Sequence, residues 1–118
     1  MESVELKQPI DEILKGRLQV ERSQISAVCE QFGIIELGVF GSVLRDDFRV
    51  DGADPSDVDV LIEFEATQRI SWQRWMDLQT ALEQVFKRKV GVVRKHLLKN
   101  PYRRADILKT NRLIYEQR

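Results

Sequence analysis

Two aspartates, Asp57 and Asp59, stand one residue apart at the start of an apolar run, residues 58–64, whose composition predicts a β-strand. Because side chains alternate along a strand, both carboxylates point the same way, with Cα atoms about 6–7 Å apart. Two carboxylates this close raise each other's pKa unless a cation lies between them. Mg²⁺ prefers oxygen ligands and binds through one or two carboxylates together with substrate phosphates. The pair therefore predicts a magnesium site for a phosphate-bearing substrate.

A Gly-Ser corner precedes the aspartates, where a predicted strand over residues 34–40 ends at Gly41 and Ser42. Small residues let the backbone approach a ligand closely. Ser42 stands where a short helix could open, so its hydroxyl and the nearby amides could hold a phosphate oxygen. Arg45, one turn further on, could reach a phosphate or a carboxylate of the site, and an ordinary surface arginine is the alternative. Gly-Ser alone indicates only a tight turn, but the Asp-x-Asp on the next strand favours a phosphate-binding role.

This arrangement resembles the signature of the DNA polymerase β-type nucleotidyltransferase superfamily. The chain is similar to the smallest members, the minimal nucleotidyltransferases that serve as antitoxins beside HEPN-domain toxins. The similarity runs from about residue 23 to about residue 115, and its motifs are a helix before GVFGS, Arg45, DVDVLIEFE, a middle helix, KVGVV, and the ending over residues 98–116.

The resemblance implies a magnesium-dependent enzyme that transfers AMP from ATP to a tyrosine hydroxyl of a partner HEPN toxin. By the same resemblance, Gly41, Ser42 and Arg45 bind the nucleotide, and Asp57 and Asp59 are the catalytic, metal-binding acids. It also implies an N-terminal extension, residues 1–22, followed by one nucleotidyltransferase domain, residues 23–118.

Gly91 departs from the family pattern, because the middle of the KVGVV strand normally supplies a third carboxylate. Glycine can neither ligate a metal nor accept a proton, and losing a positioned general base costs about 10²–10⁴-fold in rate. Glu63 lies in phase with the aspartates but is expected to be too distant to substitute, and Glu36 has no supporting motif. The alternative function is therefore a catalytically degenerate, nucleotide-binding antitoxin that neutralises its partner by masking a surface.

The segment between Ser42 and Asp57 has fourteen residues, more than the usual family pattern. Asp46 stands where a glycine is common, and turns are predicted at residues 51–52 and 54–55. A surface loop absorbs extra residues at little entropic cost, so the two strands can still meet.

The remaining patterns predict an α/β fold in which helices pack against a small mixed sheet of three to five strands. Helices are expected over residues 9–16, 23–33 and 72–87 and after Asn100-Pro101, and further strands over residues 89–93 and 113–115. The expected end signals are a stop at Gly16, an N-cap at Ser23, a C-cap at Gly33 and an N-cap at Ser71.

A functional role is conceivable for the cysteine and for the two tryptophans, but a structural role is favoured for each of them. Cys29 lies on the apolar stripe of its helix, which favours a core position over a nucleophile. Trp72 and Trp75 could stack an adenine ring, but such tryptophans more often belong to a core or a partner surface.

Composition fits one soluble domain, with 118 residues, 42% hydrophobic and 32% charged. There is no long apolar run and no signal-peptide pattern, and the single cysteine gives no intrachain disulfide, so we expect a cytoplasmic protein without membrane contact. Self-association through the Trp-bearing helix is a further expectation.

Net charge is zero but uneven: residues 46–65 carry eight acids and one base, and residues 87–118 carry eleven Lys or Arg and two acids. A solvated surface explains such runs, and the alternative is that the acidic zone gathers cations while the basic tail attracts phosphates or an acidic partner. The absence of a recognisable reading motif in the tail disfavours a third function, nucleic-acid binding.

Overall fold

A computed structural model describes residues 9–45, 48–50, 56–67 and 69–117. Within these residues, four strands form one mixed sheet in the order β3-β2-β1-β4. Strand β1 is antiparallel to both β2 and β4, and β2 is parallel to β3. The strands are β1 (Ile34–Phe40), β2 (Val58–Phe64), β3 (Val90–Arg94) and β4 (Arg112–Glu116). The predicted α/β fold with a small mixed sheet is confirmed.

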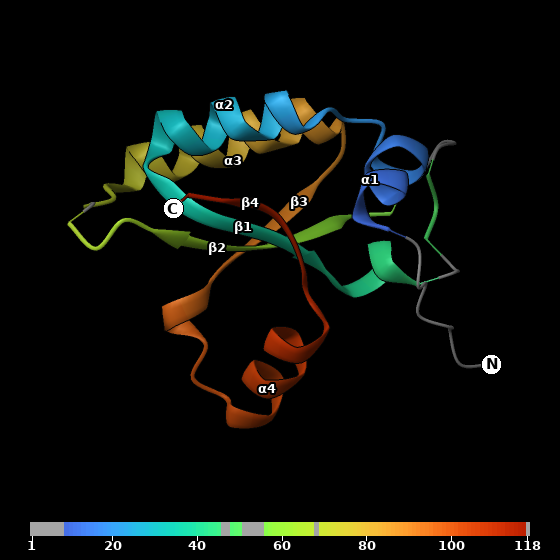
Figure 1. Ribbon diagram of the computed structural model, residues 1–118. Coiled ribbons are helices and arrows are strands. Elements are labelled where there is room, and N and C mark those ends of the chain that lie inside the picture. Colours follow the sequence, from blue (N-terminus) through green and yellow to red (C-terminus); the bar gives the residue numbers. More distant parts are fainter. Residues whose placement is uncertain (1–8, 46–47, 51–55, 68, 118) are drawn as a thin grey trace.

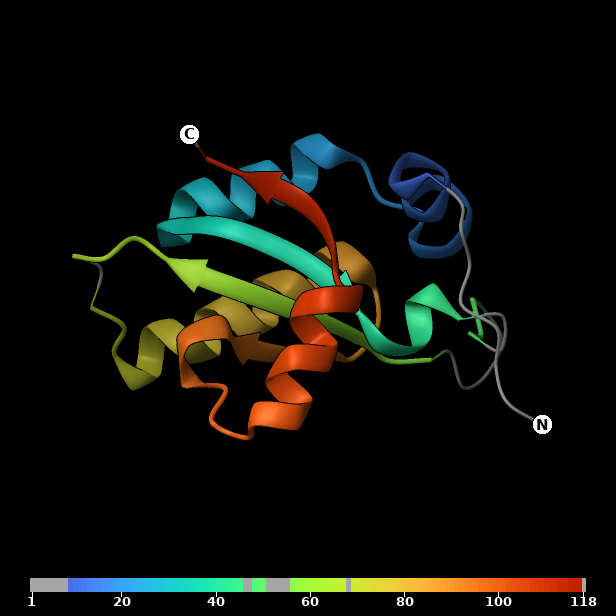
Figure 2. The same ribbon diagram turned by 60° about the horizontal axis from the view of Figure 1, so that its bottom comes forward.

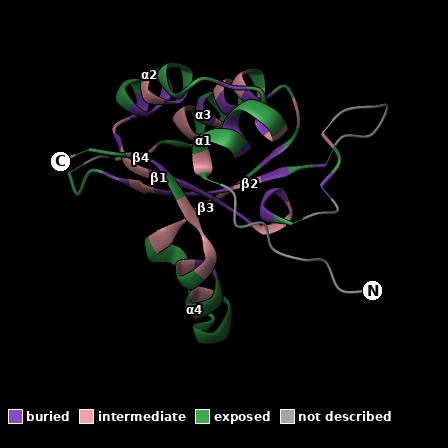
Figure 3. Cartoon of the chain, turned by 45° about the vertical axis from the view of Figure 1, so that its right-hand side comes forward, coloured by how far each residue is buried: buried purple, intermediate pink, exposed green. Residues whose placement is uncertain are grey.

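Helices cover both faces of the sheet (Figures 1 and 2). Helices α2 (Arg22–Phe32) and α3 (Trp72–Phe86) lie on one face, and α4 (Pro101–Thr110) lies on the other. Helix α1 (Ile10–Ile13) continues directly into a π-helical turn, η1 (Leu14–Leu18), at one end of the sheet. Figure 3 shows that the central strands β1 and β2 are largely buried between these layers, whereas α4 exposes much of its surface.

Strand alternation divides the side chains of β2 between two apolar clusters. Val58, Val60 and Ile62 belong to the main core with α2 and α3, whereas Leu61 packs with Phe40 and Ile107 of α4 in a smaller second cluster. Because alternate residues of a strand point to the same face, Asp59 lies on the α4 face beside Leu61.

The N-terminal segment differs from the prediction at both helix ends. Gly16 does not stop the first helix, because buried Leu18 continues it to a left-handed end at Gln19 (φ 57°). The second helix is capped by Glu21 rather than Ser23, since Glu21 and Gln24 form a reciprocal capping box in which the Glu21 amide donates to Gln24 Oε1 at 2.9 Å.

The predicted division after residue 22 remains a prediction. Ile13, Leu14 and Leu18 of the N-terminal segment pack in the same core as the sheet.

Other predicted end signals are confirmed. Gly33 ends α2 in the left-handed region (φ 72°), and Ser71 Oγ accepts from the Arg74 amide at 3.1 Å to begin α3. The Asn100 side chain accepts from the amides at the start of α4. Cys29 is fully buried in the core, as expected.

The turns predicted at residues 51–52 and 54–55, and Asp46, lie outside the described residues. Among the described residues, no helix is both long and apolar enough to cross a bilayer.

Candidate active site

The turn after β1 brings the Gly-Ser corner to the start of β2. Gly41 adopts φ +76°, a left-handed conformation that favours glycine, and opens a short 3₁₀ turn, η2 (Gly41–Leu44). The Ser42 hydroxyl donates to the backbone oxygen of Asp57 at 3.3 Å. The structure therefore brings together the predicted serine and the first predicted aspartate.

The Asp59 carboxylate lies between two glycines, Gly41 at the start of η2 and Gly91 on β3. Asp59 is opposite Phe40 in the β1–β2 register and opposite Gly91 in the β2–β3 register. A Cβ added at Gly41 would lie 2.8 Å from Asp59 Oδ2, and one added at Gly91 would lie 2.8 Å from Asp59 Oδ1. Both glycines thus leave room for this carboxylate, and Asp59 itself fills the space beside Gly91.

Burial raises the pKa of Asp59 above its usual value, and the negative charge of Asp57 raises it further. Arg103 and Arg45 act in the opposite direction, which places two cations within electrostatic reach of this carboxylate. A divalent cation between the aspartates would relieve their repulsion, and two carboxylates are a donor set that suits Mg²⁺. The residues present therefore fit the predicted metal. Within the described part of the chain, no group of three or more His, Cys, Asp or Glu side chains could hold one.

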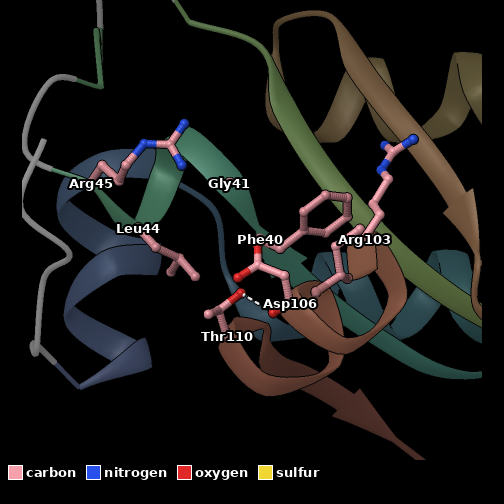
Figure 4. Close-up of a pocket in the computed structure, with 8 residues that line it drawn as sticks. Phe40, Gly41, Leu44, Arg45, Arg103, Asp106 and Thr110 are labelled. Atoms are coloured by element: carbon pink, nitrogen blue, oxygen red, sulfur yellow. Dashed lines mark hydrogen bonds between the residues drawn. The ribbon is translucent and has the colours of Figure 1, made fainter. Parts of the chain in front are cut away.

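A pocket of about 370 Å³ borders the Gly-Ser corner, between η2 and α4. Figure 4 shows Arg45, the residue after η2, and Arg103 of α4 on different sides of this pocket. Its lining combines charged and apolar side chains: Phe40, Gly41, Leu44, Arg45, Arg103, Asp106, Ile107 and Thr110. Arg45, predicted from sequence, is thus part of the site region.

Arg103 was missed in the sequence, although a signal existed. Four residues of α4 line the pocket at spacings i, i+3, i+4 and i+7, which is one helix face: Arg103, Asp106, Ile107 and Thr110. Tyr102, the large apolar residue next to Arg103, is off that face and 86% exposed. Phasing α4 on Ile107 alone would have indicated Arg103.

Glu36 and Glu63 do not supply a third acid beside the aspartates. They face each other across β1 and β2, and the Lys95 ammonium contacts both carboxylates, at 3.1 Å for Glu36 and 3.8 Å for Glu63. Glu63 is four residues from Asp59 along an extended strand, a separation of about 13 Å.

The two tryptophans do not reach this site. Trp72 and Trp75 belong to α3, on the other face of the sheet, where they line a separate groove with Val92 and Arg94. The idea that they stack an adenine bound at Asp59 is therefore wrong. Trp75 packs partly against the core and Trp72 is 77% exposed.

Known proteins are similar to this chain in sequence. Protein adenylyltransferase MntA of Thermococcus cleftensis is 38% identical over 71 residues, covering 60% of this chain and 66% of that protein, just under two thirds of its length. A Methanocaldococcus jannaschii protein assigned as a protein adenylyltransferase is 24% identical over 89 residues, covering 75% of this chain and 85% of its own.

Solved structures share the fold. One assigned as a minimal nucleotidyltransferase is 27% identical, has a TM-score of 0.57, and is matched over 77% of this chain and 86% of its own. A toxin–antitoxin structure with AMP-PNP has a TM-score of 0.58 at 10% identity, over 84% of this chain and 76% of its own.

The sequence profile of the family described as polymerase beta, nucleotidyltransferase, matches residues 23–118, which is most of the chain. That span includes the Gly-Ser corner, both aspartates and Arg103. The protein belongs to the polymerase beta nucleotidyltransferase family.

Proposed function

We propose that this chain is a magnesium-dependent nucleotidyltransferase that transfers AMP from ATP to a tyrosine hydroxyl of a HEPN-type toxin, and so acts as its antitoxin. The observation that carries the proposal is the Asp59 carboxylate, seated between Gly41 and Gly91, with Asp57 and the Ser42 corner beside it. Such a site binds a cation and a phosphate chain at one point.

Each group of the site has a part in the proposed reaction. Ser42 and the backbone at Gly41 hold phosphate oxygens, and Arg45 and Arg103 balance their negative charge. Asp57 and Asp59 would hold Mg²⁺, which supplies charge neutralisation on the phosphates when bound. These groups position the triphosphate and leave the acceptor oxygen to be aligned by the partner protein.

The transfer exchanges a phosphoanhydride bond of ATP for a phosphoester bond to the tyrosine oxygen. The tyrosine oxygen attacks the α-phosphorus of ATP, the bond from that phosphorus to the oxygen bridging to the β-phosphate breaks, and pyrophosphate leaves. The hydroxyl proton passes to water, because Gly91 offers no carboxylate at the position beside Asp59. We therefore expect nucleotide binding to be more robust than turnover.

Support for the donor and the acceptor class comes from the relatives. MntA of Thermococcus cleftensis is named as a protein adenylyltransferase, which favours AMP as the transferred group and a protein as the acceptor. The toxin–antitoxin structure with this fold supports a toxin as the partner. The cytoplasm supplies both ATP and Mg²⁺ for such a pair.

Incubation of the chain with a candidate HEPN-type toxin, [α-³²P]ATP and Mg²⁺ tests the proposal. We expect label on the toxin, lost with EDTA and reduced by at least about 100-fold in Asp57→Asn, because a metal contributes several kcal/mol to transition-state stabilisation. Mass spectrometry should find AMP on a tyrosine. The absence of metal-dependent label with a folded, nucleotide-bound chain would end the enzymatic proposal.

A masking antitoxin is the second candidate, and Gly91 favours it. In that case ATP is a structural ligand and the toxin is silenced by a covered surface. Cells carrying the toxin discriminate the two: survival with the double variant Asp57→Asn/Asp59→Asn supports masking, and death supports chemistry. Immunoblots of both proteins control for expression.

A further inference from the structure

Arg17 links the N-terminal segment to the Gly-Ser corner. Its guanidinium donates to the backbone oxygen of Val43 at 3.1 Å and also to that of Arg45. These carbonyls lie at the end of η2, where a short helical turn leaves acceptors without partners of its own. Figure 1 shows the α1 segment and this turn at the same end of the sheet. Arg17 thus fixes the turn that carries Ser42 and Arg45.

Phe48 connects Arg17 to a second arginine. The ring is 7% exposed, and the guanidinium carbons of Arg17 and Arg88 lie 5.7 Å and 5.1 Å from its centroid. Both distances are within the range of a cation–π interaction. A planar guanidinium stacks on an aromatic ring better than an ammonium group does.

Arg88 holds the segment that leads into Asp57. It donates to the backbone oxygens of Val50 at 2.7 Å, Arg49 at 3.2 Å and Ser56 at 3.3 Å. Arg49 and Ser56 also bond each other: the Ser56 amide donates to the Arg49 oxygen at 2.9 Å, and the Arg49 amide donates to Ser56 Oγ at 2.8 Å. The residue after Ser56 is Asp57, so Arg88 fixes the aspartate side of the corner.

We propose that Arg17, Phe48 and Arg88 form a positioning clamp for the nucleotide site, an inference that rests on the proposed function. In this clamp Arg17 binds η2, and Arg88 binds the residues that lead into β2. The hydrogen bond from Ser42 to Asp57 joins these two segments directly. Arg17 lies outside residues 23–118, the part that matches the family. The N-terminal segment therefore contributes to the site through Arg17, which positions the turn at the Gly-Ser corner.

Arg22 provides a matched control. It also uses its guanidinium to tie the N-terminal segment to the fold, donating to Asp11 Oδ1 at 2.7 Å and to the Ile114 oxygen at 2.6 Å, but on β4 rather than at the corner. Arg22→Gln removes comparable bonds without touching η2 or the entry to β2.

The test compares full-length wild type, Arg17→Gln, Arg17→Lys and Arg22→Gln. The first readout is amide hydrogen exchange at Arg45 and Ser56. The Arg45 amide donates to the Ser42 oxygen, and the Ser56 amide donates to the Arg49 oxygen. The second is the affinity for AMP-PNP with Mg²⁺ by calorimetry. Melting temperatures show how far each change acts on the whole fold.

In Arg17→Gln we expect faster exchange at both amides and nucleotide affinity about tenfold weaker, as for loss of a residue that orients ligands. Arg17→Lys should be intermediate, because lysine donates to carbonyls but lacks the planar fork. Arg22→Gln should lower the melting temperature while affinity stays within about twofold, since its bonds are remote from the corner.

Unchanged exchange at Arg45 and Ser56 in Arg17→Gln would overturn the clamp. Equal loss of affinity in Arg22→Gln would also overturn it, because the effect would then be general destabilisation. If wild type itself binds no AMP-PNP, the proposed function fails, and the exchange data alone decide for or against the clamp.

Discussion

Gly91 and Asp59 are opposite each other on the parallel strands β3 and β2, and the Asp59 carboxylate lies where a side chain at position 91 would begin. The glycine therefore does more than omit a third acid. It gives Asp59 the room for its present orientation.

We expect Gly91→Ala to weaken nucleotide affinity in the presence of Mg²⁺ by about tenfold, because the new Cβ displaces the Asp59 carboxylate. The displaced atom is the end of a flexible side chain, so the melting temperature should change little. Isothermal calorimetry and thermal unfolding measure both effects. Gly16→Ala is the control: nothing lies within 4 Å of its added Cβ, and it should stabilise by about 0.4–1 kcal/mol with affinity unchanged.

Gly91→Asp should not raise the rate of AMP transfer. Its Cβ meets the same Asp59 oxygen, and a third negative charge joins two that already repel. Single-turnover transfer at saturating Mg²⁺ measures this. A rate increase of about 100-fold, the scale of a recovered general base, would show that the site has room for both acids.

Arg103→Gln should weaken nucleotide affinity by at least about tenfold, because a hydrogen bond to a charged group contributes about 1.5–3 kcal/mol. Arginine and glutamine are both good helix formers, so α4 should remain folded in this variant. Lys109→Gln removes the same charge from an exposed position of α4 and should leave affinity within about twofold. The nucleotide affinities of wild type and Arg103→Gln should become more alike in high salt than in low salt, because salt screens the arginine charge. Equal effects of the two substitutions would mean that only net charge matters.

Lys95→Met should lower the free energy of unfolding by about 1–2 kcal/mol, because it leaves Glu36 and Glu63 facing each other without a cation. Adding Glu36→Gln to that variant should recover part of the loss. Urea denaturation followed by circular dichroism measures both. No recovery in the double variant would show that repulsion between the acids is not the cause.

Cys29 should be inert in the folded chain, because burial, with a smaller effect of Glu30, raises its pKa from 9.0 to about 12. At pH 8 the thiolate fraction should be about 1000-fold lower in the native state than after unfolding. DTNB should therefore react only in denaturant, and rapid reaction of the native chain would contradict this.

The same shift links Cys29 to stability at alkaline pH. The folded pKa is the raised one, so the contribution is complete below pH 9.0 and is lost as pH rises towards about 12. Between pH 8 and pH 11, wild type should lose more unfolding free energy than Cys29→Ala.

The central strands could be predicted because their signals are local. Apolar runs ending at Gly41 and beginning after Asp57 gave β1 and β2 with the bounds that the structure has. The seating of Asp59 between Gly41 and Gly91 could not be predicted, since it depends on the register of three strands that are far apart in sequence.

The misses also have physical causes. Gly16 looked like a helix stop, but burial of Leu18 outweighed the weak local preference of glycine. Arg103 and Arg17 act through the packing of α4 and η1 against the rest of the fold. The one sequence signal for Arg103 is its phase with Ile107 on α4, and no motif marks Arg17.

The separation of the sheet's two faces has a spectroscopic consequence. Trp72 and Trp75 are the two tryptophans of the chain, and both lie behind the sheet as seen from Asp59. Their fluorescence is therefore insensitive to an occupant of the aspartate side and reports on the surface of α3. With Trp72 largely in water and Trp75 partly packed, acrylamide should quench the red-shifted part of the emission first.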